Sequence, residues 1–196
     1  MFDLVYPSDP APRYPRPSVD HPGPQPPVQG EMLPLVHPDG QVYGQATREW
    51  CHGGSHALHP VVHLHIIDRD GNLYLQKRSM RKKRLPGYWD TAVGGHVSYG
   101  ETLQEALYRE AFEELGLEAF NPVCLGSYEW DTVRDRELVV IFAILGHPAL
   151  TPDGIEVSEG RWWKPQELDQ GMGQGLFTPN FEDEYKRIRP ALLAMI

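Results

Sequence analysis

One segment, residues 94–117, constrains the fold more than any other part of the chain. It begins as a glycine-rich loop and continues into a helix predicted over 102–115. Thr102 followed by Glu105 matches a capping box, which satisfies the first backbone N–H groups of a helix. Gly116 suits the left-handed residue that commonly ends one. The segment therefore predicts a loop leading into a well-defined helix.

Acidic side chains extend the apolar face of this predicted helix. A helix turns by about 100° per residue, so the face that carries Leu107 also carries Glu110 and Glu114, with Glu113 at its edge. Three carboxylates this close repel one another unless a cation lies among them. Oxygen ligands of this kind favour Mg²⁺ or Mn²⁺. The spacing fits such a metal site, and it also fits a solvated acidic face paired with Arg109.

The residues of this segment resemble a Nudix box, the signature of the Nudix hydrolase superfamily. Gly95 is followed after five residues by Glu101, and after seven more by the run Arg-Glu-Ala-Phe-Glu-Glu-Leu-Gly-Leu at 109–117. Every defined position of that 23-residue motif is filled. The resemblance implies an α+β Nudix fold, a central mixed β-sheet sandwiched between helices. In that fold the box forms a loop and a helix that hold divalent metal against a diphosphate.

The resemblance also implies roles for individual residues. Four members of the box would hold the metal: Gly95 (through its carbonyl), Glu110, Glu113 and Glu114. Glu113 or Glu114 would act as the general base, and the resemblance leaves open which. Arg109 and Glu101 would orient the helix and the loop.

A second resemblance, to the type I isopentenyl-diphosphate isomerases of the same superfamily, covers about residues 31–145. It rests on the run Lys-Lys-Arg-Leu-Pro-Gly-Tyr-Trp at 82–89, followed by Gly95 and His96. Those isomerases bind a second metal through three histidines and two carboxylates. The matching residues here form a candidate second metal site or polar cluster: His52, His59, His96, Asp135 and Glu137. The alternative is that these histidines only satisfy backbone groups, and position 135 is Asp where the isomerases usually carry Glu.

The position of Gly94 separates this chain from those isomerases. They carry their catalytic cysteine there, whereas glycine has no acid or base, and Cys51 and Cys124 lie elsewhere. The leading hypothesis is therefore a Mg²⁺- or Mn²⁺-dependent Nudix hydrolase that cleaves a diphosphate linkage in a nucleoside diphosphate derivative or another organic diphosphate. The first alternative is an enzyme like isopentenyl-diphosphate isomerase. The second is a non-catalytic nucleotide-binding module.

A basic cluster lies at residues 77–84 of an otherwise acidic chain. The chain has 18 Lys and Arg against 27 Asp and Glu, and this short segment holds six of the cations. The balance favours a small anionic ligand over nucleic acid. Arg78 and Lys82 are the candidates for phosphate contact, because Arg suits bidentate binding of phosphate and Lys supplies a mobile charge.

The rest of the chain predicts a proline-rich tail and one domain. Residues 1–30 hold nine of the 19 prolines and predict an extended or disordered tail before a Nudix domain over 31–196. No apolar run reaches the ~20 residues of a membrane helix, the start lacks a signal peptide, and two cysteines suit a cytoplasmic location. Residues 32–46 could pair with another chain, which leaves a homodimer open.

Alternating patterns and turn signals predict the remaining elements. Strands are expected over 32–36, 41–46, 61–67, 72–76, 123–129, 138–145 and 161–163, and a second helix over 181–195. His63 and His65 alternate along one of these strands and predict a half-polar sheet face.

Overall fold

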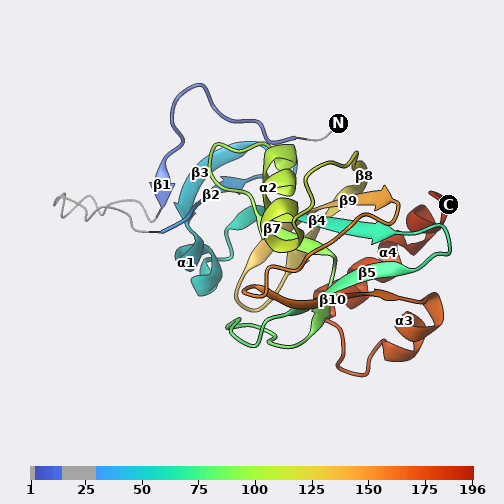
Figure 1. Cartoon of the computed structure of the whole chain (residues 1–196). Coiled ribbons are helices and arrows are strands. Elements are labelled where there is room, and N and C mark those ends of the chain that lie inside the picture. Colours follow the sequence, from blue (N-terminus) through green and yellow to red (C-terminus); the bar gives the residue numbers. More distant parts are fainter. Residues whose placement is uncertain (1–2, 15–29) are drawn as a thin grey trace. The chain divides into compact units, whose positions relative to one another are not determined.

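The computed structural model describes residues 3–14 and 30–196 (Figure 1). The chain forms two compact units, each built from several stretches of sequence. The first unit consists of residues 1–61, 96–106 and 127–140, and the second of residues 62–95, 107–126 and 141–196.

The described strands form two sheets. The smaller one has the order β1-β3-β2, from strands β1 (Arg13–Tyr14), β2 (Met32–Val36) and β3 (Val42–Thr47). The larger, seven-stranded sheet has the order β10-β5-β4-β9-β8, with β6 paired to β5 and β7 paired to β4. Its strands are β4 (Leu58–Ile67), β5 (Leu73–Arg78), β6 (Trp89–Asp90), β7 (Val93–His96), β8 (Val123–Asp131), β9 (Arg136–Leu145) and β10 (Val157–Trp163).

In the first unit, β2 and β3 form an antiparallel hairpin in which Leu33 lies opposite Ala46. The turn between them ends at Gly40, whose φ of 85° lies in the left-handed region that favours glycine. Leu33, Ala46 and the neighbouring Cys51 are fully buried in one small core. The predicted hairpin is therefore present, with a core of its own.

Two short helical turns follow this hairpin: α1 (Arg48–Trp50) and the π-helical turn η1 (Cys51–Ser55). The Thr47 side chain caps α1 by accepting a hydrogen bond from the backbone N–H of Trp50 at 3.3 Å. Neither turn is predicted by the sequence pattern. They matter because η1 carries His52.

Residues 3–14 also belong to the first unit and contact the loop that precedes α2 (Leu103–Leu115). The Asp3 carboxylate accepts from the backbone N–H of Leu103 at 3.1 Å, which caps the start of this helix. The Tyr6 hydroxyl donates to the carbonyl of Glu101 at 2.9 Å. Residues 15–29, the rest of the predicted tail, lie outside the described residues, so the division into a tail and one domain stays a prediction.

Helix α2 confirms the helix predicted from the capping box. The backbone N–H of Thr102 donates to the carboxylate of Glu105 at 2.8 Å, and the N–H of Glu105 donates back to the Thr102 hydroxyl at 3.2 Å. Gly116 has a φ of 62° and ends the helix. Ala111 and Leu115 are fully buried, as the apolar face requires.

In the second unit, β5 pairs with β10, β6 and the end of β4, and two further helices follow: α3 (Pro165–Gly171) and α4 (Pro179–Leu193). The apolar face of α4 places Phe181 next to Phe177 and Tyr185, with ring centroids 5.3 and 5.7 Å away. Within the described parts of the chain, no helix is long and apolar enough to cross a membrane.

The start of α4 is held by a buried threonine, which supplies a test of the fold. The Thr178 hydroxyl accepts from the N–H of Phe181 at 3.2 Å and donates to the Asp90 carboxylate at 2.9 Å. We expect Thr178→Ala to lower the free energy of unfolding by about 1–2 kcal/mol, measured by urea denaturation. Thr178→Ser keeps both hydrogen bonds and is the control. An alanine variant as stable as the serine variant would contradict the capping role.

Candidate functional site

The three glutamates predicted as metal ligands, Glu110, Glu113 and Glu114, lie on the part of α2 that belongs to the second unit, at different depths. Glu114 is buried, the Glu110 side chain is 15% exposed, and that of Glu113 is 57% exposed. Arg109 holds the outer two, with Nη1 2.7 Å from Glu110 Oε1 and 3.3 Å from Glu113 Oε2. The three predicted carboxylate ligands therefore lie on one helix, and two of them, Glu110 and Glu113, contact Arg109.

Glu114 is the electrostatically unusual member of this group. Burial and the nearby charge of Glu110 raise its pKa to about 8, even though the N–H of Gly94 donates to its Oε2 at 3.2 Å. The Gln76 side chain also donates to this oxygen at 3.1 Å. Two carboxyl groups here cannot both be charged near neutral pH without a cation, which is the condition that a divalent metal relieves.

Gly95 allows the Glu110 carboxyl group to lie directly against the loop backbone. A Cβ added at residue 95 would be 2.0 Å from the Glu110 carboxyl carbon, far inside van der Waals contact. A side chain at residue 95 would therefore displace the Glu110 carboxylate, whereas glycine leaves the backbone and this carboxylate close together. The cation site predicted at Glu110, Glu113, Glu114 and the Gly95 carbonyl stays a prediction.

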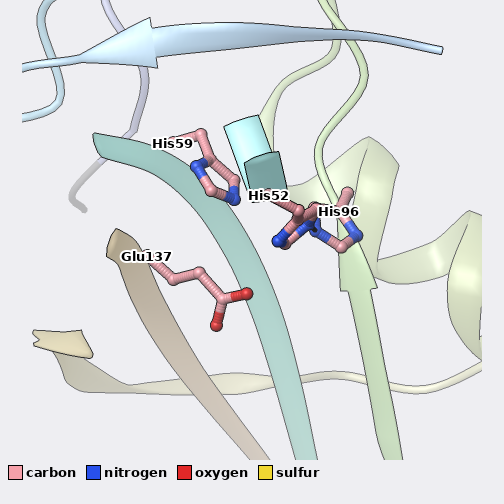
Figure 2. A group of neighbouring side chains, drawn as sticks. All are labelled: His52, His59, His96 and Glu137. Atoms are coloured by element: carbon pink, nitrogen blue, oxygen red, sulfur yellow. Dashed lines mark hydrogen bonds between the residues drawn. The ribbon is translucent and has the colours of Figure 1, made fainter. Parts of the chain in front are cut away.

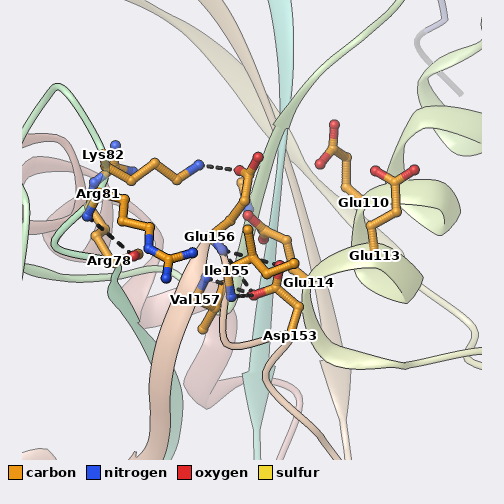
Figure 3. A network of polar contacts seen from close by, with 12 residues as sticks. Arg78, Arg81, Lys82, Glu110, Glu113, Glu114, Asp153, Ile155, Glu156 and Val157 are labelled. Carbon is orange, nitrogen blue, oxygen red and sulfur yellow. Dashed lines mark hydrogen bonds and ion pairs between the residues drawn. The ribbon is translucent and has the colours of Figure 1, made fainter.

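The candidate phosphate ligands lie in the same unit, and each contacts an acidic residue (Figure 3). Arg78 Nη1 is 3.2 Å from the Asp90 carboxylate, and the guanidinium also donates to the carbonyl of Arg84. Lys82 forms an ion pair with Glu156. Both cations are therefore held by carboxylates that an anionic ligand would have to replace.

The loop that carries Glu156 is attached to the end of α2. The backbone N–H of Asp153 donates to the carbonyl of Glu114 at 3.0 Å. The Asp153 carboxylate accepts from the N–H groups of Ile155, Glu156 and Val157, which lowers its pKa despite partial burial (Figure 3). Glu156 is thereby kept close to both Lys82 and the carboxylates of the helix.

The candidate histidines come together in the first unit (Figure 2). His52 Nε2 lies 2.8 Å from His96 Nε2, and His52 Nδ1 lies 2.6 Å from Asp135 Oδ2. One potential ligand atom from each of four residues lies within 4.8 Å of the others: His52, His59, His96 and Glu137. The structure therefore brings together every residue of the predicted cluster. Asp135 contacts the His52 nitrogen that faces away from His96.

His59 shows why this cluster fits a metal ion. Its Nδ1 is 3.0 Å from the carbonyl of Ala57, so this nitrogen carries the proton and Nε2 presents a lone pair. Nε2 is buried and has no hydrogen-bond partner among the residues that the structure describes. Burial lowers the pKa of His59 to about 4, which keeps the ring neutral at ordinary pH. A neutral imidazole with an unsatisfied buried nitrogen is suited to bind a divalent cation.

Some residues of these sites were predicted and others were not. Glu101, predicted to orient the loop, lies in the first unit, where the N–H of Ser98 donates to its carboxylate at 2.9 Å. Gln76 and Glu156 were missed, because a single polar residue in a strand or loop carries no periodic signal. Glu184 was also missed, although it lies one turn from Phe181 and Ile188 on the apolar face of α4. The periodicity that selected Glu110 and Glu114 would have found it.

Comparison with known proteins supports the same family. The NUDIX domain family matches residues 57–181 of this chain. The chain belongs to the Nudix family. It is 28% identical over 170 residues to the isopentenyl-diphosphate Delta-isomerase of Brevibacterium linens, covering 83% of this chain and 93% of that protein. It is 29% identical over 150 residues to the Salmonella typhi protein named uncharacterized Nudix hydrolase YfcD, covering 76% and 80%.

A solved structure agrees with these relatives. DR0079 from Deinococcus radiodurans is 27% identical, covers 80% of this Nudix chain and 98% of its own, and has a TM-score of 0.70. The predicted α+β Nudix fold and the likeness to the isomerase branch are thereby confirmed, and membership of the Nudix family supports the predicted class of enzyme, a Nudix hydrolase. The roles of individual site residues stay predictions.

The raised pKa of Glu114 predicts how the stability of the metal-free protein depends on pH. The folded protein holds this proton up to about pH 8, whereas the ordinary pKa is 4.5, so the free energy of unfolding falls as the pH rises between these values. In wild type we expect the free energy of unfolding to fall by roughly 3–5 kcal/mol over this pH range, and we expect Glu114→Gln to abolish this fall. Urea denaturation with a chelator at several pH values measures it.

The exposed neighbour Glu113 supplies the control, because Glu113→Gln should keep the fall. The lowered pKa of His59 acts with the opposite sign, but only between about pH 4 and 6.5, so the comparison is cleanest from pH 6.5 to 8. Equal pH dependence in wild type and Glu114→Gln would show that Glu114 does not titrate in this range.

The two clusters predict two separable metal sites. We expect wild type to bind two Mn²⁺ ions per chain, Glu113→Gln with Glu114→Gln to lose one, and His59→Phe to lose the other, each with at least about a tenfold drop in affinity. Electron paramagnetic resonance of free Mn²⁺ measures the stoichiometry. If His59→Phe binds as much Mn²⁺ as wild type, the histidines are a polar cluster rather than a metal site.

Proposed function

We propose that this Nudix protein hydrolyses a diphosphate linkage in a small organic diphosphate, with Mg²⁺ or Mn²⁺ held by the α2 glutamates. The observation that carries the proposal is the buried Glu114 carboxyl group, which accepts from the N–H of Gly94 at 3.2 Å and lies near Glu110, so that its pKa is raised. A buried carboxyl group beside a second carboxylate is unfavourable in a helix with only a structural role. In a metal-dependent hydrolase a bound cation would make the pair favourable.

The metal would supply charge neutralisation of the diphosphate and a more acidic bound water. The chain's own residues supply the rest. Arg109 keeps the Glu110 and Glu113 carboxylates oriented through contacts of 2.7 and 3.3 Å. Gly94 and Gln76 hold Glu114 by donating to its Oε2. The proton of the attacking water would go to Glu113 or Glu114, the two carboxylates proposed for general base catalysis.

The substrate class follows from the cations of the second unit. Arg78 forms an ion pair with Asp90, and Lys82 forms one with Glu156. A bound diphosphate would replace these carboxylates as the partner of the two cations. The pair of Lys82 with Glu156 is the more exposed of the two, and a carboxylate in such a pair can be exchanged for a more highly charged phosphate at little cost in stability. We therefore propose Arg78 and Lys82 as phosphate ligands for an organic diphosphate.

An isomerase activity is the second candidate, and the histidine cluster favours it. The residues that correspond to the isomerases' second metal site meet in the first unit, and named isopentenyl-diphosphate isomerases are among the relatives. Against it stands Gly94, which has no group to move a proton at carbon. A non-catalytic binding module is disfavoured because all four defined glutamates of the box are present.

One experiment separates these functions. We expect wild type with Mg²⁺ or Mn²⁺ to release phosphate or a monophosphate from at least one member of a panel of organic diphosphates that includes isopentenyl diphosphate. Phosphorus and proton NMR follow the reaction. Glu113→Gln and Glu114→Gln should each lower kcat by a factor of about 10²–10⁴, since each removes a metal ligand or the base.

The control variant is Glu118→Gln, which removes a carboxylate beyond the end of the same helix. Its activity should equal that of wild type. A shifted double bond in isopentenyl diphosphate with the diphosphate intact would replace the hydrolase proposal by the isomerase. Binding of the panel without turnover would favour the binding module.

A further inference from the structure

A buried polar cluster lies in the second unit, apart from the glutamates of the box. It consists of His63 and His65 on β4 and Glu184 on α4. His63 Nδ1 lies 2.9 and 3.1 Å from the two Glu184 oxygens, and His65 Nε2 lies 2.6 Å from Oε1. A carboxylate in the core of this unit is therefore held by two imidazole rings at once.

This cluster is organised around a charge in the protein interior. The Glu184 side chain is fully buried, which alone would raise its pKa, but the charge of His63 and hydrogen bonds from both histidines hold it well below the usual range. A buried carboxylate of this kind is tolerated when a proton on a neighbouring ring balances it. The carboxylate also fixes the orientation of each ring, because it accepts from one nitrogen of each.

His63 is the outermost member of the cluster. Its side chain is 11% exposed, whereas those of Glu184 and His65 are 0% and 1% exposed. His65 is covered in part by Phe181, which stacks on it with a centroid distance of 6.3 Å. His63 is therefore the least deeply buried of the three.

The outer edge of the His63 ring lies beside Gly94. A side chain starting at residue 94 would first meet His63, with a Cβ 3.5 Å from Cδ2 and 3.6 Å from Nε2. Gly94 in turn donates its N–H to Glu114 of the box. The glycine thus has the catalytic glutamate on one side and the polar edge of an imidazole on the other.

We propose that His63, positioned by Glu184, is a specificity-determining residue that donates a hydrogen bond to an oxygen of the substrate's organic group beside Gly94, so that the protein selects oxygen-rich diphosphates over alkenyl diphosphates. The inference rests on the proposed function, since it concerns the group attached to the diphosphate. The charge of Glu184 favours the doubly protonated form of His63, in which Nδ1–H is donated to the carboxylate and Nε2–H is a charge-assisted donor. An alkenyl chain beside it would remove water without replacing the hydrogen bond, whereas a sugar-like group would replace it.

A matched pair of ligands tests this proposal. Ribose 5-diphosphate and isopentenyl diphosphate have the same number of carbons and differ in their oxygens, and inorganic diphosphate is the common reference. Their affinities for the full chain are measured by calorimetry with Ca²⁺, and phosphorus NMR confirms that the ligands remain intact. We expect wild type to prefer ribose 5-diphosphate, and His63→Phe to reduce this preference about tenfold while leaving the affinity for inorganic diphosphate unchanged.

Two further variants distinguish a contact with substrate from a structural effect. His65→Phe removes the other ring from Glu184, and because His65 is buried we expect the preference to be unchanged. Glu184→Gln keeps an acceptor for both rings but removes the charge, and we expect an intermediate preference. If His63→Phe does not fold, the double variant His63→Phe with Glu184→Leu replaces it, since it removes the buried charge together with its partner.

The outcomes separate this inference from the function on which it rests. If wild type does not bind inorganic diphosphate, the proposed function is wrong and this inference fails with it. If inorganic diphosphate binds but the two organic ligands bind equally, or isopentenyl diphosphate binds more tightly, only the specificity inference is overturned. A loss of preference in His65→Phe equal to that in His63→Phe would also overturn it, because it would show a general effect of packing.

Discussion

The burial of the Glu114 carboxyl group on the inner face of α2, near the charge of Glu110, is the constraint on which the candidate site depends. Leu107, Ala111 and Leu115 require this face to be buried, and burial takes the carboxyl group of Glu114 with it. The consequence is a pKa of about 8 for that group. The helix that forms part of the core therefore carries an electrostatic cost that a bound cation would lower, and we propose that this couples the fold of the segment to metal binding.

Three ionisable side chains that the structure describes, Glu114, Glu184 and His59, are buried with different partners. Glu114 is held by a backbone N–H and a glutamine and remains able to take up a proton. Glu184 is held by two histidines and keeps its charge. The His59 ring is buried in neutral form with one nitrogen unsatisfied. The interaction that would stabilise each group therefore depends on its partners. Glu114 and His59 would be stabilised by a bound cation, whereas Glu184 is stabilised by a proton on a neighbouring ring.

The sequence predicted most of the regular structure because the signals there are local. The capping box at Thr102, the glycine at 116 and the alternation in the strands each specify backbone conformation over a few residues, and the elements are where these signals predict them. Helices α1 and α3 and the short strands β6 and β7 were missed. They are too short for a periodic pattern, and contacts with other segments hold them in place.

What the sequence by itself determined is the loop and helix of the Nudix box, with its glutamates on one face, since helical spacing alone brings residues three and four apart together. Tertiary structure decided which groups far apart in the chain meet. The contact between His52 and Asp135 spans 83 residues, and that between His63 and Glu184 spans 121. Tertiary structure also decided which of the glutamates is buried, because depth depends on what packs over a helix. Spacing along one chain carries no information about either, so the chemistry of these groups emerges only when the chain folds.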